Sequence, residues 1–217
     1  MKIKICGITC LEDLTLADSF GADFVGFIQT PESPRYISKN NLQKILSAFS
    51  GKAIPVLVFV NETLETMLSL IKKLSVKMVQ LHGEETPDTV TALKNKGLCV
   101  IKAFPIKNNS SFKFLEHYNK AAGAHPDHFL LDTAHPEKKG GTGKSFDWSL
   151  LKNQKTLVKN ALIAGGITAD TLPILLEQCA PWGIDISSGV ESEPGKKDPQ
   201  KMRDLFNRVR ERRENFD

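Results

Sequence analysis

The chain has 217 residues, of which 41% are hydrophobic and 25% charged, and its formal net charge is +4. This balance is typical of a globular protein with a sizeable core and argues against a disordered chain. No apolar run reaches the roughly 20 residues of a membrane span, and the opening MKIKICGITC is too short and interrupted for a secretory signal, so we expect a cytoplasmic protein without a membrane partner.

Short β-branched runs alternate with longer stretches of helical period along the whole chain. Strands are predicted, in order, at residues 3–8, 23–28, 55–60, 76–81, 99–104, 128–132, 160–165 and 182–187. Helices are predicted at residues 11–19, 40–49, 64–74, 86–95, 111–120, 146–152, 169–178 and from Pro199 onward. Thr9 and Asn61 are expected to cap two of these helices, and Pro199 suits the first turn of the last one.

The order of the elements favours one fold class. Nearly continuous apolar strands that alternate with helices indicate a parallel sheet covered on its outer side. Eight such units favour closure into a (β/α)₈ barrel of the TIM type. The alternative is a doubly wound open sheet, but no Gly-x-Gly-x-x-Gly follows the first strand. No linker or low-complexity tract divides the sequence, so we expect residues 1–217 to form a single domain.

Much of the positive charge lies in residues 196–217. Within this tail Met202, Leu205, Phe206 and Val209 follow helical spacing, which predicts an amphipathic helix with its arginines in water. We therefore expect no nucleic-acid partner, although a small anionic ligand is compatible with the charge.

The cysteines are scattered, at positions 6, 10, 99 and 179. In a chain of this size scattered thiols are expected to stay reduced. The spacing of Cys6 and Cys10 is not Cys-x-x-Cys, and no second pair accompanies it, so we expect neither a metal nor a disulfide. Cys6 is then either a small core residue or a reactive thiol.

Reactive groups of such a barrel are expected where its strands end. Cys6 ends the first strand, Gln80 and His82 the fourth and Asp132 the sixth, while Asp185 lies on the eighth. Cys6 and Asp132 are candidates for a base and an acid. At pH 7 a free thiol is mostly protonated and a free carboxyl mostly ionised, so these roles require the site to shift both pKa values. The alternative for Asp132 is a local cap or ion pair.

The last two strands run into AGGIT and ISSGV. Gly165 and Gly166 follow the seventh strand, and Ser187 and Ser188 follow the eighth. Backbone N–H groups in such turns bind phosphate, and this pair of loops often does so in (β/α)₈ barrels. We therefore expect a phosphate site here.

Two other segments carry weaker signals. Arg35, in SPRY beyond the second strand, has the fork geometry that suits a carboxylate, although a solvated surface arginine is the alternative. Residues 133–148 have no apolar period and contain three glycines. Loops of this length often act as lids or binding loops, and a loose insertion is the alternative.

Together these motifs resemble one family, the phosphoribosylanthranilate isomerases of tryptophan biosynthesis. The similar segments run in order over almost the whole chain: KICGIT, DFVGFI, SPRYIS, PVLVFVN, VQLHG, FLLDT, GGTGKSFDW, LIAGGIT and GIDISSGVESEPGKKDP. The resemblance implies a barrel enzyme, monomeric or homodimeric, that needs no cofactor or metal. Its small-molecule substrate is N-(5-phosphoribosyl)anthranilate, which an Amadori rearrangement converts to 1-(2-carboxyphenylamino)-1-deoxyribulose 5-phosphate.

The resemblance also implies residue roles. Cys6 corresponds to the general base, Asp132 to the general acid and Arg35 to the contact with the anthranilate carboxylate. The phosphate cradle corresponds to the loops of Gly165, Gly166, Ser187 and Ser188, and the other substrate-lining candidates are Gln80, His82 and Asp185. The sequence differs from the family pattern at residues 29–32 and at Ile167. These differences affect the expected contacts with the anthranilate end of the substrate.

Two other functions are weighed against this one. The aldose-ketose isomerase of histidine biosynthesis shares the architecture but is expected to pair two aspartates, and Cys6 stands in place of the first. A noncatalytic phosphate-binding barrel would not need titratable groups at its strand ends, so Cys6 and Asp132 favour an enzyme.

Overall fold

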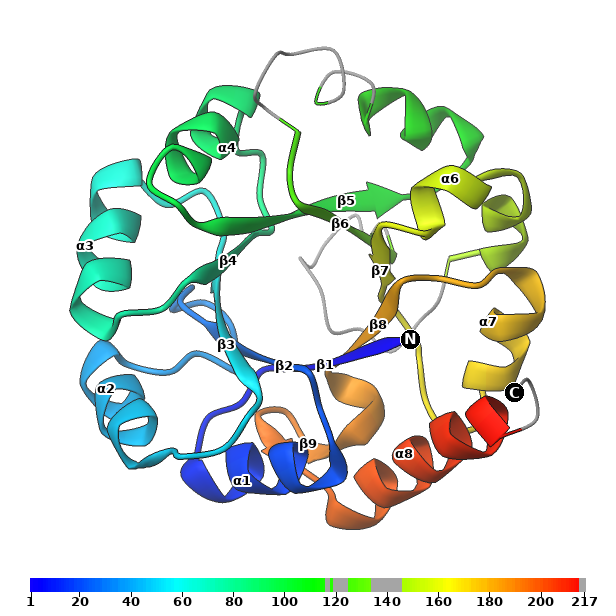
Figure 1. Ribbon diagram of the computed structural model, residues 1–217, viewed down its shortest axis with the longest axis horizontal. Coiled ribbons are helices and arrows are strands. Elements are labelled where there is room, and N and C mark those ends of the chain that lie inside the picture. The colour runs from blue at the N-terminus through cyan, green and yellow to red at the C-terminus, as the bar shows by residue number, and fades with distance from the viewer. Residues whose placement is uncertain (116–117, 119–124, 134–145, 215–217) are drawn as a thin grey trace.

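The computed structural model describes residues 1–115, 118, 125–133 and 146–214. Within them, eight parallel strands close into a barrel in sequence order, with β8 pairing back to β1 (Figure 1). The strands are β1 (Lys2–Cys6), β2 (Phe24–Ile28), β3 (Ile54–Phe59), β4 (Met78–Leu81), β5 (Cys99–Ile106), β6 (His128–Thr133), β7 (Ala161–Ile163) and β8 (Gly183–Ile186). The predicted (β/α)₈ fold is confirmed.

Helices surround the strands on the outside of the ring (Figure 1). The α-helices are α1 (Leu11–Phe20), α2 (Lys39–Ala48), α3 (Leu64–Leu74), α4 (Pro87–Lys94), α6 (Lys155–Val158), α7 (Leu172–Gln178) and α8 (Pro199–Glu214). The 3₁₀ helices are η1 (Asn109–Phe114), η2 (Trp148–Asn153) and η3 (Ser188–Val190). A small antiparallel pair, β9 (Glu191–Glu193) and β10 (Lys196–Lys197), follows η3 and was not predicted.

The predicted elements differ from the observed ones mainly after β5 and β6. The helix expected at residues 111–120 begins as η1, and residues 116–117 and 119–124 lie outside the described part. The helix expected at residues 146–152 is instead η2 followed by the short α6. Residues 134–145, most of the predicted lid or binding loop, also lie outside the described residues.

The cap predictions for Thr9 and Asn61 are wrong. The hydroxyl of Thr9 donates to the Gly195 carbonyl at 2.6 Å instead of capping α1. Thr63, not Asn61, caps α3, since its hydroxyl accepts from the Thr66 N–H at 3.2 Å. Pro199 does begin α8, as predicted.

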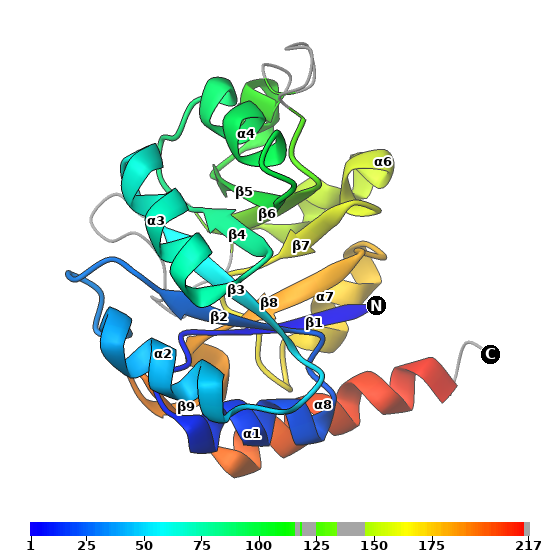
Figure 2. The same ribbon diagram turned by 60° about the vertical axis from the view of Figure 1, so that its left-hand side comes forward.

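The amphipathic character predicted for α8 is confirmed. Met202, Leu205, Phe206 and Val209 are all buried. Both views show α8 lying beside α1 (Figure 2), and the rings of Phe20 and Phe206 stack with centroids 5.7 Å apart. No helix formed by the described residues is long and apolar enough to cross a membrane.

The strands bury side chains on both faces, so one face of each strand lines the barrel interior and the other packs against the helices. One apolar cluster fills the barrel interior: Phe24, Val56, Met78, Ile101, Ala103, Leu130, Leu162 and Ala164. On β1, Ile3 and Ile5 belong to the separate core between strands and helices. Because successive side chains of a strand point to opposite faces, Lys4 and Cys6 point into the barrel. The interior therefore carries charged and reactive groups on β1 in addition to the apolar cluster.

Candidate active site

Cys6 lies at the carboxyl end of β1, buried, directly opposite Gly26 of β2. A Cβ atom at position 26 would lie 2.7 Å from the Cys6 sulfur and 3.0 Å from Lys4 Nζ. Glycine is therefore required here by the close approach of two neighbouring side chains. The ammonium of Lys4 donates to Asp185 Oδ1 across the β1–β8 pair at 2.9 Å. The thiol, the ammonium and the Asp185 carboxylate thus meet inside the barrel.

The ionisation of this cluster is set by burial and by its charges. The pKa of the Cys6 thiol is raised overall: burial raises it most, the charge and hydrogen bond of Lys4 act against this rise, and Asp185 adds to it. For Lys4, burial favours the neutral amine, but Asp185 and Cys6 outweigh it, so the pKa of Lys4 is raised. Lys4 is therefore an ammonium at neutral pH, held next to the thiol.

Asp132 lies near the end of β6 and is held from two sides. Its Oδ1 accepts from the Thr133 N–H at 2.7 Å, and its Oδ2 lies 3.4 Å from His82 Nε2. The Gln80 amide nitrogen lies 2.7 Å from His82 Nδ1. With the amide as donor, Nδ1 accepts and Nε2 carries the proton that faces Asp132. The structure thus brings together Gln80, His82 and Asp132, as the strand-end argument predicted.

The loops after β7 and β8 reach the same end of the barrel. Gly165 and Gly166 have φ values of 86° and 67°, a region that disfavours other residues. A Cβ at Gly165 would collide with the Thr133 hydroxyl and lie 3.0 Å from Asp132 Oδ1. The Ser187 hydroxyl is buried and has no hydrogen-bond partner among the described residues. Such hydroxyls are rare in folded proteins, so Ser187 is a candidate for contact with a ligand.

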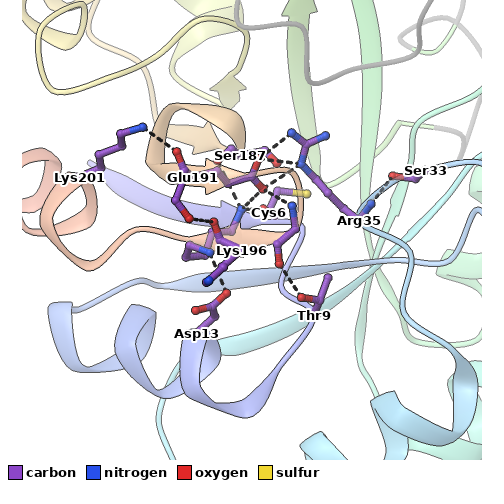
Figure 3. Close-up of polar contacts among 12 residues, drawn as sticks. Cys6, Thr9, Asp13, Ser33, Arg35, Ser187, Glu191, Lys196 and Lys201 are labelled. Carbon is purple, nitrogen blue, oxygen red and sulfur yellow. Dashed lines mark hydrogen bonds and ion pairs between the residues drawn. The ribbon is translucent and has the colours of Figure 1, made fainter.

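Arg35 is 7% exposed, so the solvated-surface alternative is wrong. Its Nε donates to Glu191 Oε1 at 2.9 Å, and its Nη2 donates to Oε2 at 2.6 Å. Lys197 Nζ donates to Glu191 Oε1 at 2.7 Å and to the Cys6 carbonyl at 2.6 Å. Figure 3 shows Arg35, Ser187 and Glu191 gathered around Cys6. The network ties the loop after β2 to the end of β1, and Nη1 of Arg35 takes no part in the pair with Glu191.

The amino-acid sequence matches the model of a known family. Residues 3–208 match the sequence model of N-(5′-phosphoribosyl)anthranilate isomerase. The chain belongs to the phosphoribosylanthranilate isomerase family. The isomerase of Pelobacter propionicus is 37% identical over 214 residues, covering 98% of this chain and 97% of the relative. That of Crocosphaera subtropica is 38% identical and covers 97% and 99%. The predicted family is confirmed, and the chain is an isomerase of tryptophan biosynthesis.

Solved structures of phosphoribosylanthranilate isomerases have the same fold. The Thermotoga maritima enzyme is 32% identical with a TM-score of 0.86, covering 97% of this chain and 99% of its own. The Thermus thermophilus enzyme is also 32% identical, with a TM-score of 0.84 and the same coverage. The comparison therefore extends over nearly the whole barrel of this isomerase.

Sequence reasoning missed the charged partners of the candidate site. Lys4, Glu191 and Lys197 were not singled out, although all three are buried. A signal for Lys4 existed, because it stands two residues before Cys6 on the same face of a strand. Glu191 and Lys197 lie in a segment that matches the family but has no periodic pattern. Across the described parts of the chain, no three His, Cys, Asp or Glu side chains are placed to hold a metal ion.

Proposed function

We propose that this isomerase converts N-(5′-phosphoribosyl)anthranilate to 1-(2-carboxyphenylamino)-1-deoxyribulose 5-phosphate by an Amadori rearrangement. The observation that carries the proposal is the pair of reactive groups at one barrel mouth, with Cys6 ending β1 and Asp132 near the end of β6. A solved relative, 31% identical with a TM-score of 0.83, holds reduced 1-(o-carboxyphenylamino)-1-deoxyribulose 5-phosphate. That molecule is the reduced form of the proposed product.

The first step is assigned to Asp132. In its acid form it gives a proton to the furanose ring oxygen, the bond from C1′ to that oxygen breaks, and the nitrogen lone pair forms an iminium. The contacts with the Thr133 N–H and with His82 support this role because they fix the direction of the carboxyl group. A positioned acid of this kind typically contributes about 10²- to 10⁴-fold in rate.

The second step is assigned to Cys6. The iminium acidifies the C2′ proton, which the Cys6 thiolate removes, and the electron pair moves to give an enolamine. Tautomerisation of the enolamine then places a proton on C1′ and leaves a ketone at C2′. The adjacent Lys4 ammonium supports this role because it opposes the effect of burial on the pKa of the thiol.

The phosphate end of the substrate is assigned to the loops after β7 and β8. Gly165 and Gly166 present backbone in a conformation suited to close approach, and the Ser187 hydroxyl lacks a partner among the described residues. Ser188 begins η3 beside Ser187. Fixing this end restrains the sugar against the base, and positioning of this kind makes a large contribution to rate.

The anthranilate carboxylate is assigned to Arg35. Glu191 already occupies one edge of the guanidinium, so the proposed contact uses Nη1, which is not part of that pair. The proposed lining of the substrate between its two ends consists of Gln80, His82 and Asp185. Replacing Arg35 with Ala should raise KM more than it lowers kcat, and an unchanged KM would reject the carboxylate contact.

The deciding experiment measures turnover of freshly prepared substrate by the loss of anthranilate-adduct fluorescence. Cys6→Ala and Asp132→Asn should each lower kcat by about 10²-fold or more while circular dichroism stays unchanged. Cys179→Ala is the matched control, because it removes a thiol from the end of α7 and should leave kcat intact. Near wild-type turnover in either site variant would remove that residue from the mechanism.

We also propose that residues 1–217 form one catalytic domain, supported by the match over residues 3–208. We propose a cytoplasmic location, which fits four cysteines that form no disulfide with one another. The oligomeric state is proposed to be a monomer or a homodimer, and one Thermotoga maritima relative is described as dimeric. Light scattering of the purified chain separates the two.

A further inference from the structure

We propose that Lys4 is a positioning residue for the reaction, whose ammonium, anchored by Asp185 inside the barrel, favours the thiolate form of Cys6. This inference rests on the proposed role of Cys6 as the base. Lys4 acts through Cys6 and is not assigned a contact with substrate.

The first support is the placement of the two side chains. Lys4 and Cys6 are separated by one residue on β1 and share its inward face. Both approach the same point above Gly26, since a Cβ there would lie 2.7 Å from the sulfur and 3.0 Å from Nζ. The absence of a side chain at position 26 therefore lets the ammonium and the thiol come together.

The second support is the anchor. Lys4 stands directly opposite Asp185 in the β1–β8 register, and the two side chains pair at 2.9 Å with almost no exposure to water. A buried ion pair is a poor source of stability, because apolar replacements of similar volume are often equally or more stable. The apolar cluster that fills the barrel interior needs no charged partner. The Lys4–Asp185 pair is therefore better explained by its effect on the neighbouring Cys6 thiol than by a contribution to stability.

The third support is the balance of charges around the thiol. Among the described residues, the charges with the largest effect on Cys6 are Lys4 on its own strand, Asp185 on β8 and Lys197 on β10. The facing residue on β2 is Gly26, which carries no charge. Lys4 acts through both its charge and a hydrogen bond and opposes the effect of burial more strongly than Lys197 does. Lys4 is therefore the main group that stabilises the thiolate.

The test is the pH dependence of Cys6 alkylation by iodoacetamide in the substrate-free enzyme, followed by peptide mass spectrometry to separate Cys6 from the other thiols. Lys4→Met should raise the pH midpoint of alkylation by about one unit or more, since an opposite charge at close range shifts a pKa by about 1–3 units. Asp185→Asn should lower the midpoint, because it removes a negative charge that disfavours the thiolate. A purely structural effect of the two substitutions would not shift the alkylation midpoint in opposite directions.

Lys102→Met is the matched control. Lys102 is also buried and pairs with a carboxylate, Glu85, at 3.0 Å, but it lies on β5 and is not among the charges with the largest effect on Cys6. The Lys102→Met variant should lose about as much stability as Lys4→Met, but its Cys6 alkylation should keep the pH midpoint of the wild type. If Lys4→Met does not fold, Lys4→Met combined with Asp185→Asn removes the whole pair and should still raise the midpoint, by less than the single variant.

A wild-type midpoint in Lys4→Met or in the double variant would overturn the inference, as would a shift in the same direction for Lys4→Met and Asp185→Asn. The proposed function is tested separately. If Cys6→Ala is inactive and the midpoint does not depend on Lys4, the base assignment stands and the role of Lys4 is rejected. If Cys6→Ala retains turnover, the base assignment fails whatever the alkylation shows, and the catalytic role of Lys4 fails with it.

Discussion

Replacing Glu191 with Gln should destabilise the enzyme strongly, because one carboxylate holds two buried cations. Glu191 accepts from Arg35 and from Lys197, which are 7% and 3% exposed. The amide keeps the shape of the side chain but removes its charge, leaving both cations without their shared anion. Breaking a buried ion pair costs about 3–5 kcal/mol. In a chain of this size each kcal/mol lowers Tm by about 2–4 °C, so the expected loss is about 6–20 °C.

The pH dependence of this loss follows from the ionisation of Glu191. Burial alone would raise the pKa of Glu191, but the hydrogen bonds from Arg35 and the charge of Lys197 outweigh burial and lower it. A carboxyl with a lowered folded-state pKa stabilises the protein above its unfolded pKa, and this contribution is lost as pH falls through the folded value. The difference in Tm between the wild type and Glu191→Gln should therefore be largest near neutrality and shrink below pH 4.5.

The assay is differential scanning calorimetry of both proteins between pH 4 and 8. Glu193→Gln is the matched control, because Glu193 is exposed and its contact with Lys196 at 3.7 Å joins two solvated side chains. Exposed pairs contribute about 0–1 kcal/mol, so the control should melt within a few degrees of the wild type. A Glu191→Gln protein that melts like this control, or whose Tm difference persists unchanged in acid, would refute the reasoning.

Three further predictions concern the thiol, the outer core and alkaline stability. Gly26→Ala should lower kcat about 100-fold, since its Cβ would displace the Cys6 sulfur by about 1 Å, and a loss below threefold in the fluorescence assay contradicts this. Phe206→Ala should lower the free energy of unfolding by about 3–5 kcal/mol, because Phe206 is 2% exposed, and a loss below 1 kcal/mol in urea titrations counts against it. Burial raises the pKa of Cys99 and Cys179 to about 11 from 9.0, so stability should fall between pH 9 and 11 as the unfolded thiols ionise first. Cys179→Ala should make that fall shallower, and an equal slope in urea titrations would contradict the assignment.

The barrel was predictable because its signals are local. Nearly continuous apolar runs in the strands and helical spacing in α8 indicate which side chains are buried. Cys6 and Asp132 were found in the same way, since each stands near a strand end. The 3₁₀ helices η1 and η2 differ from the predicted α-helices because each segment has only six residues, too few for the apolar spacing to distinguish the two helix types.

The partners of these residues were not predictable, because they come from distant parts of the chain. Lys4 and Asp185 are 181 residues apart, and Arg35 and Glu191 are 156 apart. Their pairing requires the barrel to close, which no local pattern specifies. Thr9 shows the same limit, since its hydroxyl donates to the distant Gly195 carbonyl, while the N-cap position of α1 is Cys10.

The contact between Lys197 and the Cys6 carbonyl joins residues 191 positions apart and has a consequence for the order of folding. During synthesis β1 leaves the ribosome before the other strands, yet one of its edges stays open until β8 is made. Contacts of such sequence separation slow folding, and an open strand edge is a site for wrong pairing. The nascent enzyme therefore remains exposed to misassembly until its last residues emerge, and a chain released before Lys197 would lack the contact that holds the end of its first strand.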